Sequence, residues 1–271
     1  MKSLLLTFDL EEFVCPAERK LEIPKERLFE VSREGLKNII KILENNNIRA
    51  TFFTTYEFAN KNKDLIRTLV KKGNEISMHG YEHNTSLNKM KSEDVIKELR
   101  KAKMGIEKIT GKKVNGFRSP QMKILNEKIL NNIGIKYDSS LHPTFIPGNF
   151  QMFKTRSIHK RGNVIEIPVS VTPILRLPFS WVWFRNAGLL YTKICTKLNL
   201  IDKDYVNIYF HPWDFYNTNT REFKGVLYIS LRNAGEKTIE QLDRYVIWCK
   251  KNNLEVTTIS EYLSKKALIK P

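Results

Sequence analysis

Short apolar runs rich in β-branched and aromatic residues alternate with amphipathic segments along most of the chain. Eight of these runs are expected to be strands, at residues 4–8, 48–55, 74–78, 114–117, 135–137, 164–171, 205–210 and 254–259. Helical periodicity occupies much of the intervening sequence, at residues 32–45, 56–72, 92–111, 126–132, 186–198 and 236–252. Strands that alternate with helices of this length are typical of parallel βαβ units. The chain is therefore expected to be an α/β protein, built either as an open doubly wound sheet or as a barrel.

Five side chains suited to catalysis each follow the end of a different expected strand. They are Asp9, His79, Arg118, Asp138 and His211. A barrel gathers the carboxyl ends of its strands into one mouth, where barrel active sites are built. No glycine-rich phosphate loop is found, which counts against a nucleotide-binding doubly wound sheet. The pattern favours a barrel with a catalytic mouth.

His79 and His83 stand four residues apart directly after an expected strand, and Gly80 between them allows the chain to turn. Two imidazoles and a carboxylate from elsewhere give a divalent metal three protein ligands and leave a position for water. An isolated pair of this spacing is also common in ordinary surface loops. The clusters at the other strand ends favour the metal site.

Composition narrows the class of protein. The 271 residues are 41% hydrophobic and 28% charged, as in a globular protein, and no linker or repeat suggests a division, so residues 1–271 are expected to form one domain. The net charge is +17, with the basic residues spread over helix faces, and no nucleic-acid recognition motif is found, so no nucleic-acid partner is expected. Three distant cysteines argue against a disulfide framework, and the N-terminus does not resemble a signal peptide. A cytoplasmic location is expected.

These motifs together resemble the polysaccharide deacetylases with NodB homology, carbohydrate esterase family 4, in the branch with a D-x-E opening and a Y-F-H-P-W ending. The resemblance covers roughly residues 3–260 in the correct order. The matching stretches are Thr7-Phe8-Asp9-Leu10-Glu11, His79-Gly80-Tyr81-Glu82-His83, Arg118-Ser119-Pro120, Tyr137-Asp138-Ser139-Ser140 and Tyr209-Phe210-His211-Pro212-Trp213. The resemblance implies a distorted (β/α) barrel with about seven parallel strands.

It also implies a role for each matching residue. Asp9 is expected to be the general base, held ionised by Arg118, and His211 the general acid, with Asp138 as its partner. The metal ligands are expected to be Glu11, His79 and His83. Two substrate contacts complete the set: the backbone N–H of Gln121 toward the oxyanion, and Trp213 against a sugar face or the acetyl methyl. A structural role for Trp213 beside His211 is the alternative.

The first motif departs from the commonest family pattern, which has two adjacent aspartates. Here Asp9 and Glu11 are separated by Leu10, and Glu12 is also available as a ligand. Zinc is the expected ion for a site of two histidines and a carboxylate, although other divalent ions suit the same ligands. His142 and His159 lie in an expected long polar loop, residues 141–162, and are expected to take no part.

The implied reaction is removal of an N-acetyl, or O-acetyl, group from an amino sugar, polysaccharide or lipid-linked glycan. Two alternatives stay open: hydrolysis of a small cyclic amide or ureide, and an inactive barrel that binds glycan or a membrane surface. The aromatic segment 177–184 is expected mainly to cover the barrel. With Arg176 and Arg185 beside it, it also suits a substrate wall or a peripheral contact with the inner membrane surface. The sequence does not indicate the oligomeric state.

Overall fold

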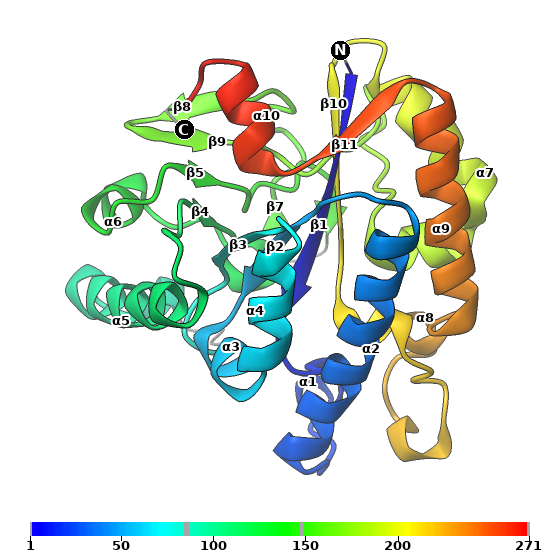
Figure 1. The fold of residues 1–271 in the computed structure, drawn as a ribbon, viewed down its shortest axis with the longest axis horizontal. Helices are drawn as coiled ribbons and strands as arrows, with labels where there is room; N and C mark the ends of the chain where they lie inside the picture. Colours follow the sequence, from blue (N-terminus) through cyan, green and yellow to red (C-terminus); the bar gives the residue numbers. More distant parts are fainter. Residues whose placement is uncertain (1, 84–86, 147–148, 270–271) are drawn as a thin grey trace.

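A computed structural model describes residues 2–83, 87–146 and 149–269, and the strand-to-helix alternation forms a strongly curled sheet (Figure 1). The strand order is β10 (Tyr205–Phe210), β1 (Lys2–Leu10), β2 (Thr51–Thr54), β3 (Glu75–Met78), β4 (Gly116–Phe117), β5 (Tyr137–Asp138), β9 (Val164–Glu166) and β8 (His159–Arg161). A further strand, β11 (Leu254–Thr257), pairs with the first half of β1. All these pairs are parallel except β8 with β9. The structure confirms the α/β class and the distorted barrel.

The two ends of the curled sheet are joined by a side-chain amide. Pro168 follows β9 and has no N–H to give to a ladder, so regular pairing stops there. The Asn207 side chain on β10 donates instead to the carbonyls of Ile167 and Pro168, and the Ser170 N–H donates to the Asn207 carbonyl at 2.8 Å. This bridge draws the last parallel strand toward the first.

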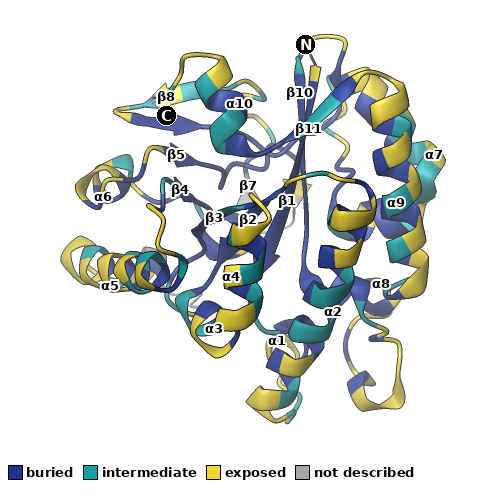
Figure 2. Ribbon diagram, in the orientation of Figure 1, coloured by how far each residue is buried: buried dark blue, intermediate teal, exposed yellow. Residues whose placement is uncertain are grey.

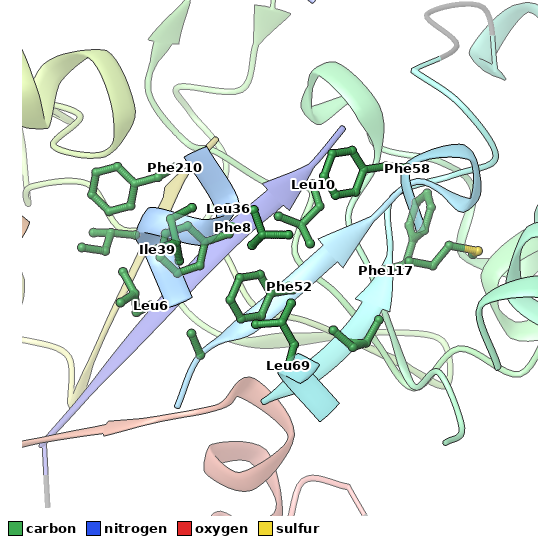
Figure 3. Close-up of a cluster of buried hydrophobic side chains, with 14 of the residues drawn as sticks. Leu6, Phe8, Leu10, Leu36, Ile39, Phe52, Phe58, Leu69, Phe117 and Phe210 are labelled. Carbon is green, nitrogen blue, oxygen red and sulfur yellow. The ribbon is translucent and has the colours of Figure 1, made fainter. Parts of the chain in front are cut away.

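The helices pack around the sheet. They are α1 (Cys15–Glu18), α2 (Lys25–Asn45), α3 (Tyr56–Lys61), α4 (Lys63–Lys71), α5 (Ser92–Thr110), α6 (Glu127–Asn132), α7 (Trp181–Asn199), α8 (Tyr228–Leu231), α9 (Glu236–Lys251) and α10 (Ile259–Lys265). Most of them bury the apolar side chains of the sheet's outer face, whereas Ile259, Tyr262 and Leu263 of α10 pack against Leu5 on the inner face. Figure 2 shows the strands buried and the outward helix faces exposed. In the core of Figure 3, Phe8 stacks on Phe52 with ring centroids 5.0 Å apart, and Leu36 and Ile39 of α2 belong to the same cluster.

All eight expected strands are present, whereas several helix boundaries differ. Helix α2 begins seven residues before the expected start at Ser32, which is buried within the helix, because Pro24 starts the helix instead. The expected helix 56–72 is two helices that meet at Asn62. The expected loop 141–162 contains the short strands β6 (Phe145–Ile146) and β7 (Asn149–Phe150) as well as β8. Within the described ranges, no helix has both the length and the apolar content to cross a bilayer.

Candidate active site

Strand β1 delivers two carboxylates to the inside of the barrel. Side chains of a strand alternate between its two faces. Leu6, Phe8 and Leu10 pack with the outer helices, so the odd-numbered Asp9, and Glu11 directly after the strand, lie on the inner side. Both are almost fully buried. The spacing D-x-E therefore places the two carboxylates on one face.

Arg118, which follows β4, holds Asp9 through a buried ion pair. Its Nη1 donates to Asp9 Oδ1 at 2.8 Å and to the Thr7 hydroxyl at 2.9 Å. Its Nε and Nη2 donate to the carbonyl and hydroxyl of Ser139. The guanidinium also lies 4.2 Å from the ring centroid of Phe53. A planar fork fixed on this many partners positions the Asp9 carboxylate firmly.

Glu11 meets the two histidines of the H-x-x-x-H motif. The His79 Nδ1 lies 2.7 Å from the Arg118 carbonyl, which can only accept, so Nδ1 carries the proton and Nε2 keeps its lone pair. That Nε2 lies 3.2 Å from Glu11 Oε2, and the Nε2 of His83 lies 3.6 Å from the same oxygen. Among the described residues, Glu11 Oε2 has no hydrogen-bond partner. Burial raises the pKa of Glu11 well above its usual range, against the opposing effect of His83.

The donor set fits a divalent metal ion. Across the described ranges no group of three His, Cys, Asp or Glu side chains is spaced to enclose an ion as it stands. Ligand atoms around a tetrahedral zinc ion at roughly 2.0–2.2 Å lie about 3.3–3.6 Å apart, close to the separations of 3.2 and 3.6 Å between Glu11 and the two imidazoles. A buried carboxylate oxygen without a donor is satisfied by such an ion. Glu12, the alternative ligand, makes no described ion pair with either histidine.

His211, which follows β10, stands opposite these groups with its ring held on two sides. Trp213 stacks on it at 4.3 Å with the rings nearly parallel, and Trp181 meets it edge-on at 4.8 Å. Its Nε2 lies 4.0 Å from Glu11 Oε1, which brings it into the same site. Burial, followed by the charges of His79 and His83, lowers the pKa of His211 well below its usual range.

The carboxylate beside His211 is Asp214, and the expectation that Asp138 fills this place is corrected. Asp214 Oδ2 accepts from the His211 backbone N–H at 2.9 Å and lies 3.9 Å from Nδ1. Arg185 holds the other oxygen of Asp214 at 2.5 Å. Burial raises the pKa of Asp214 to about 6, against the opposing effect of Arg185. Neither Asp214 nor Arg185 was predicted for this role, although His211 and Asp214 are only three residues apart.

Asp138 belongs to a separate buried cluster between β5 and β9. Its carboxylate accepts from the Ser140 hydroxyl and from Arg161 at 3.0 Å, and Arg161 also binds Glu166 at 2.9 Å. Burial raises the pKa of Asp138, and it raises that of Glu166 well above its usual range. The Ser140 hydroxyl also accepts from the Ser119 N–H at 2.8 Å. Asp138 therefore supports the loop that follows Arg118 and makes no described contact with His211.

The loop carrying Gln121 has an unusual backbone. Gln121 and Met122 have φ angles of 56° and 54°, a region that residues other than glycine rarely occupy. The side chain of Gln151 anchors this turn by donating to the Met122 carbonyl at 2.7 Å. Such strain persists only where the surroundings impose it, and it gathers at active sites. The predicted oxyanion donor thus lies in a strained turn two residues after Ser119.

The tryptophan that was expected to contact the substrate is buried, and a different tryptophan reaches the site. Trp213 is only 1% exposed and packs between His211 and Phe13, so it supports the imidazole and has no free face for a sugar. From the segment 177–184, Trp181 reaches His211, while Phe179 and Phe184 are buried in the core. The segment therefore mainly covers the barrel, as expected, and contributes one ring to the site.

The remaining histidines are placed differently from each other. His159 lies on β8, partly exposed, away from the site. His142 is buried, against the expectation of a polar loop, and meets Tyr209 edge-on at 5.7 Å. Neither ring nitrogen of His142 has a described hydrogen-bond partner, and burial lowers its pKa to about 3. No role is assigned to either residue.

Comparison with known families agrees with this geometry. Residues 1–137 match the model of the polysaccharide deacetylase family. The chain belongs to that family. Residues 139–260 match a domain of unknown function, DUF3473, and strands from both matched regions share the one sheet. The polysaccharide deacetylase match contains Asp9, Glu11, His79, His83 and Arg118, whereas His211 lies in the second match.

Individual relatives share parts of the chain or its fold. A peptidoglycan deacetylase from Helicobacter pylori is 29% identical over 119 residues, which cover 42% of this chain and 39% of that protein. The match thus spans less than half the length of that relative. A CE4-family pseudoenzyme from Bacillus anthracis has a TM-score of 0.57 at 17% identity, covering 96% of this chain and 64% of that one. An allantoinase has a TM-score of 0.64 at 15% identity, covering 96% and 88%.

Proposed function

We propose that this chain hydrolyses the N-acetyl group of an amino sugar within a glycan, using a divalent metal ion held by Glu11, His79 and His83. The observation that carries the proposal is the buried Glu11 Oε2, which has no hydrogen-bond donor in the part of the chain that the structure describes and faces two imidazole nitrogens. Family membership and the peptidoglycan deacetylase relative support a carbohydrate substrate. Zinc is the ion that this donor set suits best.

Glu11, His79 and His83 would hold the divalent ion, which would supply Lewis-acid chemistry toward the acetyl carbonyl. The proposal gives Asp9 the task of accepting the proton of the attacking water. Arg118 fixes the orientation of that carboxylate through Asp9 Oδ1 and leaves Oδ2 for the water. The backbone N–H of Gln121, in its strained turn, is the proposed donor to the developing oxyanion.

His211 is the proposed donor of the proton to the leaving amine. Its pKa is lowered in the free protein, so the proton that it gives away must reach it during the reaction. Asp214, 3.9 Å from Nδ1, is the carboxylate that would stabilise the imidazolium, and Arg185 keeps Asp214 in place. This role was predicted for Asp138, which is bound instead to Arg161.

The test combines metal content with acetate release. Purified protein loaded with zinc is expected to hold about one ion per chain and to release acetate from N-acetylglucosamine oligomers or peptidoglycan. Glu11→Ala and His79→Ala should lose the ion, whereas Asp9→Asn and His211→Ala should keep it and lose roughly 10²–10⁴-fold in turnover. His159→Ala is the matched control, because that histidine lies outside the site.

Two outcomes would overturn the proposal. Retention of the ion by Glu11→Ala and His79→Ala would remove the assigned ligands. Failure of the zinc-loaded protein to release acetate from any acetylated glycan would remove the activity, and ring opening of a cyclic ureide by the same protein would replace it.

A further inference from the structure

The exposed apolar side chains gather on one side of the molecule. In the described residues, sixteen large hydrophobic side chains are exposed, and eight of them lie between Ile174 and Ile201. This part of the chain is the turn before α7 and the helix itself, at the right-hand edge of Figure 1, next to α9. Single exposed apolar residues are normal on a protein surface, but a concentration of this kind marks an interaction site.

The second part of α7 presents a continuous apolar stripe. Gly188, with φ 87°, breaks the helix, and beyond it Leu190, Ile194 and Leu198 recur every four residues on the exposed side. Ile201 extends the stripe past the end of the helix. The opposite side of the helix is buried, where the Thr196 hydroxyl bonds with Tyr245 of α9. The stripe is therefore the side of α7 that the core leaves uncovered.

A turn before the helix adds two more apolar side chains to this side. Ile174 is 93% exposed and Leu175 72%. Ile174 has φ 52°, a strained conformation for a β-branched residue. An isolated antiparallel β-bridge between Val171 and Pro178 closes the turn. The Tyr191 hydroxyl of α7 donates to the Pro178 carbonyl at 2.7 Å and so attaches the turn to the helix. Ile174 is thus exposed to solvent in a strained backbone conformation. Packing within the protein does not explain either its exposure or its strain.

The charged side chains that α7 and the turn before it contribute are all basic. From residue 167 to residue 201 the sequence contains no Asp or Glu, although the whole chain has 29. The basic side chains of this side are Arg176, Lys193 and Lys197. The first acidic residue that follows, Asp202, is neutralised by Arg156 at 2.8 Å. An apolar stripe bordered by cations is complementary to a surface that offers hydrocarbon and negative charge together.

We propose that this side of the protein docks on the surface of a bilayer that contains anionic phospholipid. The α7 face, as we call it, consists of Ile174, Leu175, Leu190, Ile194, Leu198 and Ile201, with Arg176, Lys193 and Lys197. A second copy of the chain is a poorer occupant, because two such faces would bring cations together without an acidic partner. The site predicted from sequence for a membrane contact, residues 177–184, is mostly buried, so the docking surface is formed by residues on either side of that segment.

The proposal does not depend on the chemistry of the active site, although α7 begins at Trp181, whose ring meets His211. It is tested by flotation of the full chain with vesicles of three parts phosphatidylcholine to one part phosphatidylglycerol, and with vesicles of phosphatidylcholine alone. Wild-type protein should float with the anionic vesicles, and binding should fall as salt is raised. Acetate release is not measured, so failure here leaves the proposed function intact.

Paired variants make the test specific to the α7 face. Ile194→Ser with Lys197→Glu removes one exposed apolar and one basic side chain from α7, and should lower partition to anionic vesicles at least about tenfold. Met104→Ser with Lys108→Glu makes the same change on α5, on the other side of the molecule in Figure 1, and should leave partition unchanged. Circular dichroism of both variants checks that they fold.

Three results would overturn the proposal. The first is wild-type protein that stays unbound to anionic vesicles. The second is an equal loss in both paired variants, since that would reflect net charge alone. The third is a wild-type dimer by light scattering that the Ile194→Ser, Lys197→Glu variant converts to a monomer without changing its vesicle binding, which would assign the α7 face to self-association.

Discussion

Replacing Arg118 by methionine tests how strongly the buried ion pair with Asp9 is built into the fold. Methionine keeps an unbranched apolar side chain against Phe53 but removes the hydrogen bonds to Asp9, Thr7 and Ser139. Asp9 is 2% exposed and would be left as an uncompensated buried carboxylate. Removing one partner of such a pair costs roughly 3–5 kcal/mol. With a urea m-value of about 3 kcal/mol/M, the unfolding midpoint should fall by roughly 1–1.7 M.

The assay is urea unfolding followed by far-ultraviolet circular dichroism, with a chelator present so that bound ions do not contribute. Arg27→Met is the matched control, because Arg27 forms a similar fork with Glu222 at 2.8 Å on the surface. That variant should cost no more than about 1 kcal/mol. In a double-mutant cycle, Asp9→Asn should recover at least about 1 kcal/mol of the loss caused by Arg118→Met. Equal costs for the two arginine variants, or strictly additive effects of Asp9→Asn and Arg118→Met, would refute the reasoning.

Three further predictions concern stability, each measured as a melting temperature or a free energy of unfolding. Gly35→Ala should destabilise the protein by about 1–3 kcal/mol or more, because a Cβ on this glycine of α2 would lie 1.8 Å from the backbone oxygen of Pro212. Glu166→Gln should flatten the loss of stability that accompanies a rise in pH above about 4.3. The pKa of Glu166 is raised in the fold, so the native state holds a proton that the unfolded chain releases above about pH 4.3, and stability falls as pH rises. Ala267→Gly should add about 0.5–1 kcal/mol, because Ala267, which directly follows the C-cap residue Lys266 of α10, has φ 55°.

Each of these has a contradicting outcome. A Gly35→Ala protein of unchanged stability would mean that α2 and the turn after His211 move apart freely. An unchanged slope of stability against pH in Glu166→Gln would show that Glu166 is ionised in the fold. A loss of stability in Ala267→Gly would mean that the last turn of α10 gains more from the alanine side chain than it loses in backbone strain.

The positions of the strands and the first carboxylates could be predicted because they follow from local pattern. Strand β1 has eight buried residues in succession, and its alternation alone puts Asp9 and Glu11 on the side opposite Phe8. The register of a parallel sheet then brings strand ends together, which places His79 and Arg118 beside them. These placements need no knowledge of side-chain rotamers.

The partner of His211 could not be predicted in this way because it depends on turn geometry. The short turn η3 (Pro212–Phe215) folds the chain back so that Asp214 caps the His211 N–H. Asp138 was predicted instead, because it lies at a strand end and matches the fourth motif of the family that the sequence resembles. The orientation of Trp213 and the burial of His142 likewise result from packing between distant segments, which leaves no periodic trace in the sequence.

The pairing of β1 has a consequence for how the chain reaches its folded state. One edge of β1 is shared: Lys2–Leu5 pairs with β11, and Thr7–Leu10 pairs with β2. The other edge pairs with β10. During synthesis β1 therefore cannot complete its pairing until β10 and β11 emerge, about 200 and 250 residues later. Contacts so distant in sequence slow folding and leave one edge of β1 and half of the other unpaired until then, so a nascent chain of this protein is expected to depend on chaperones until its last strand is made.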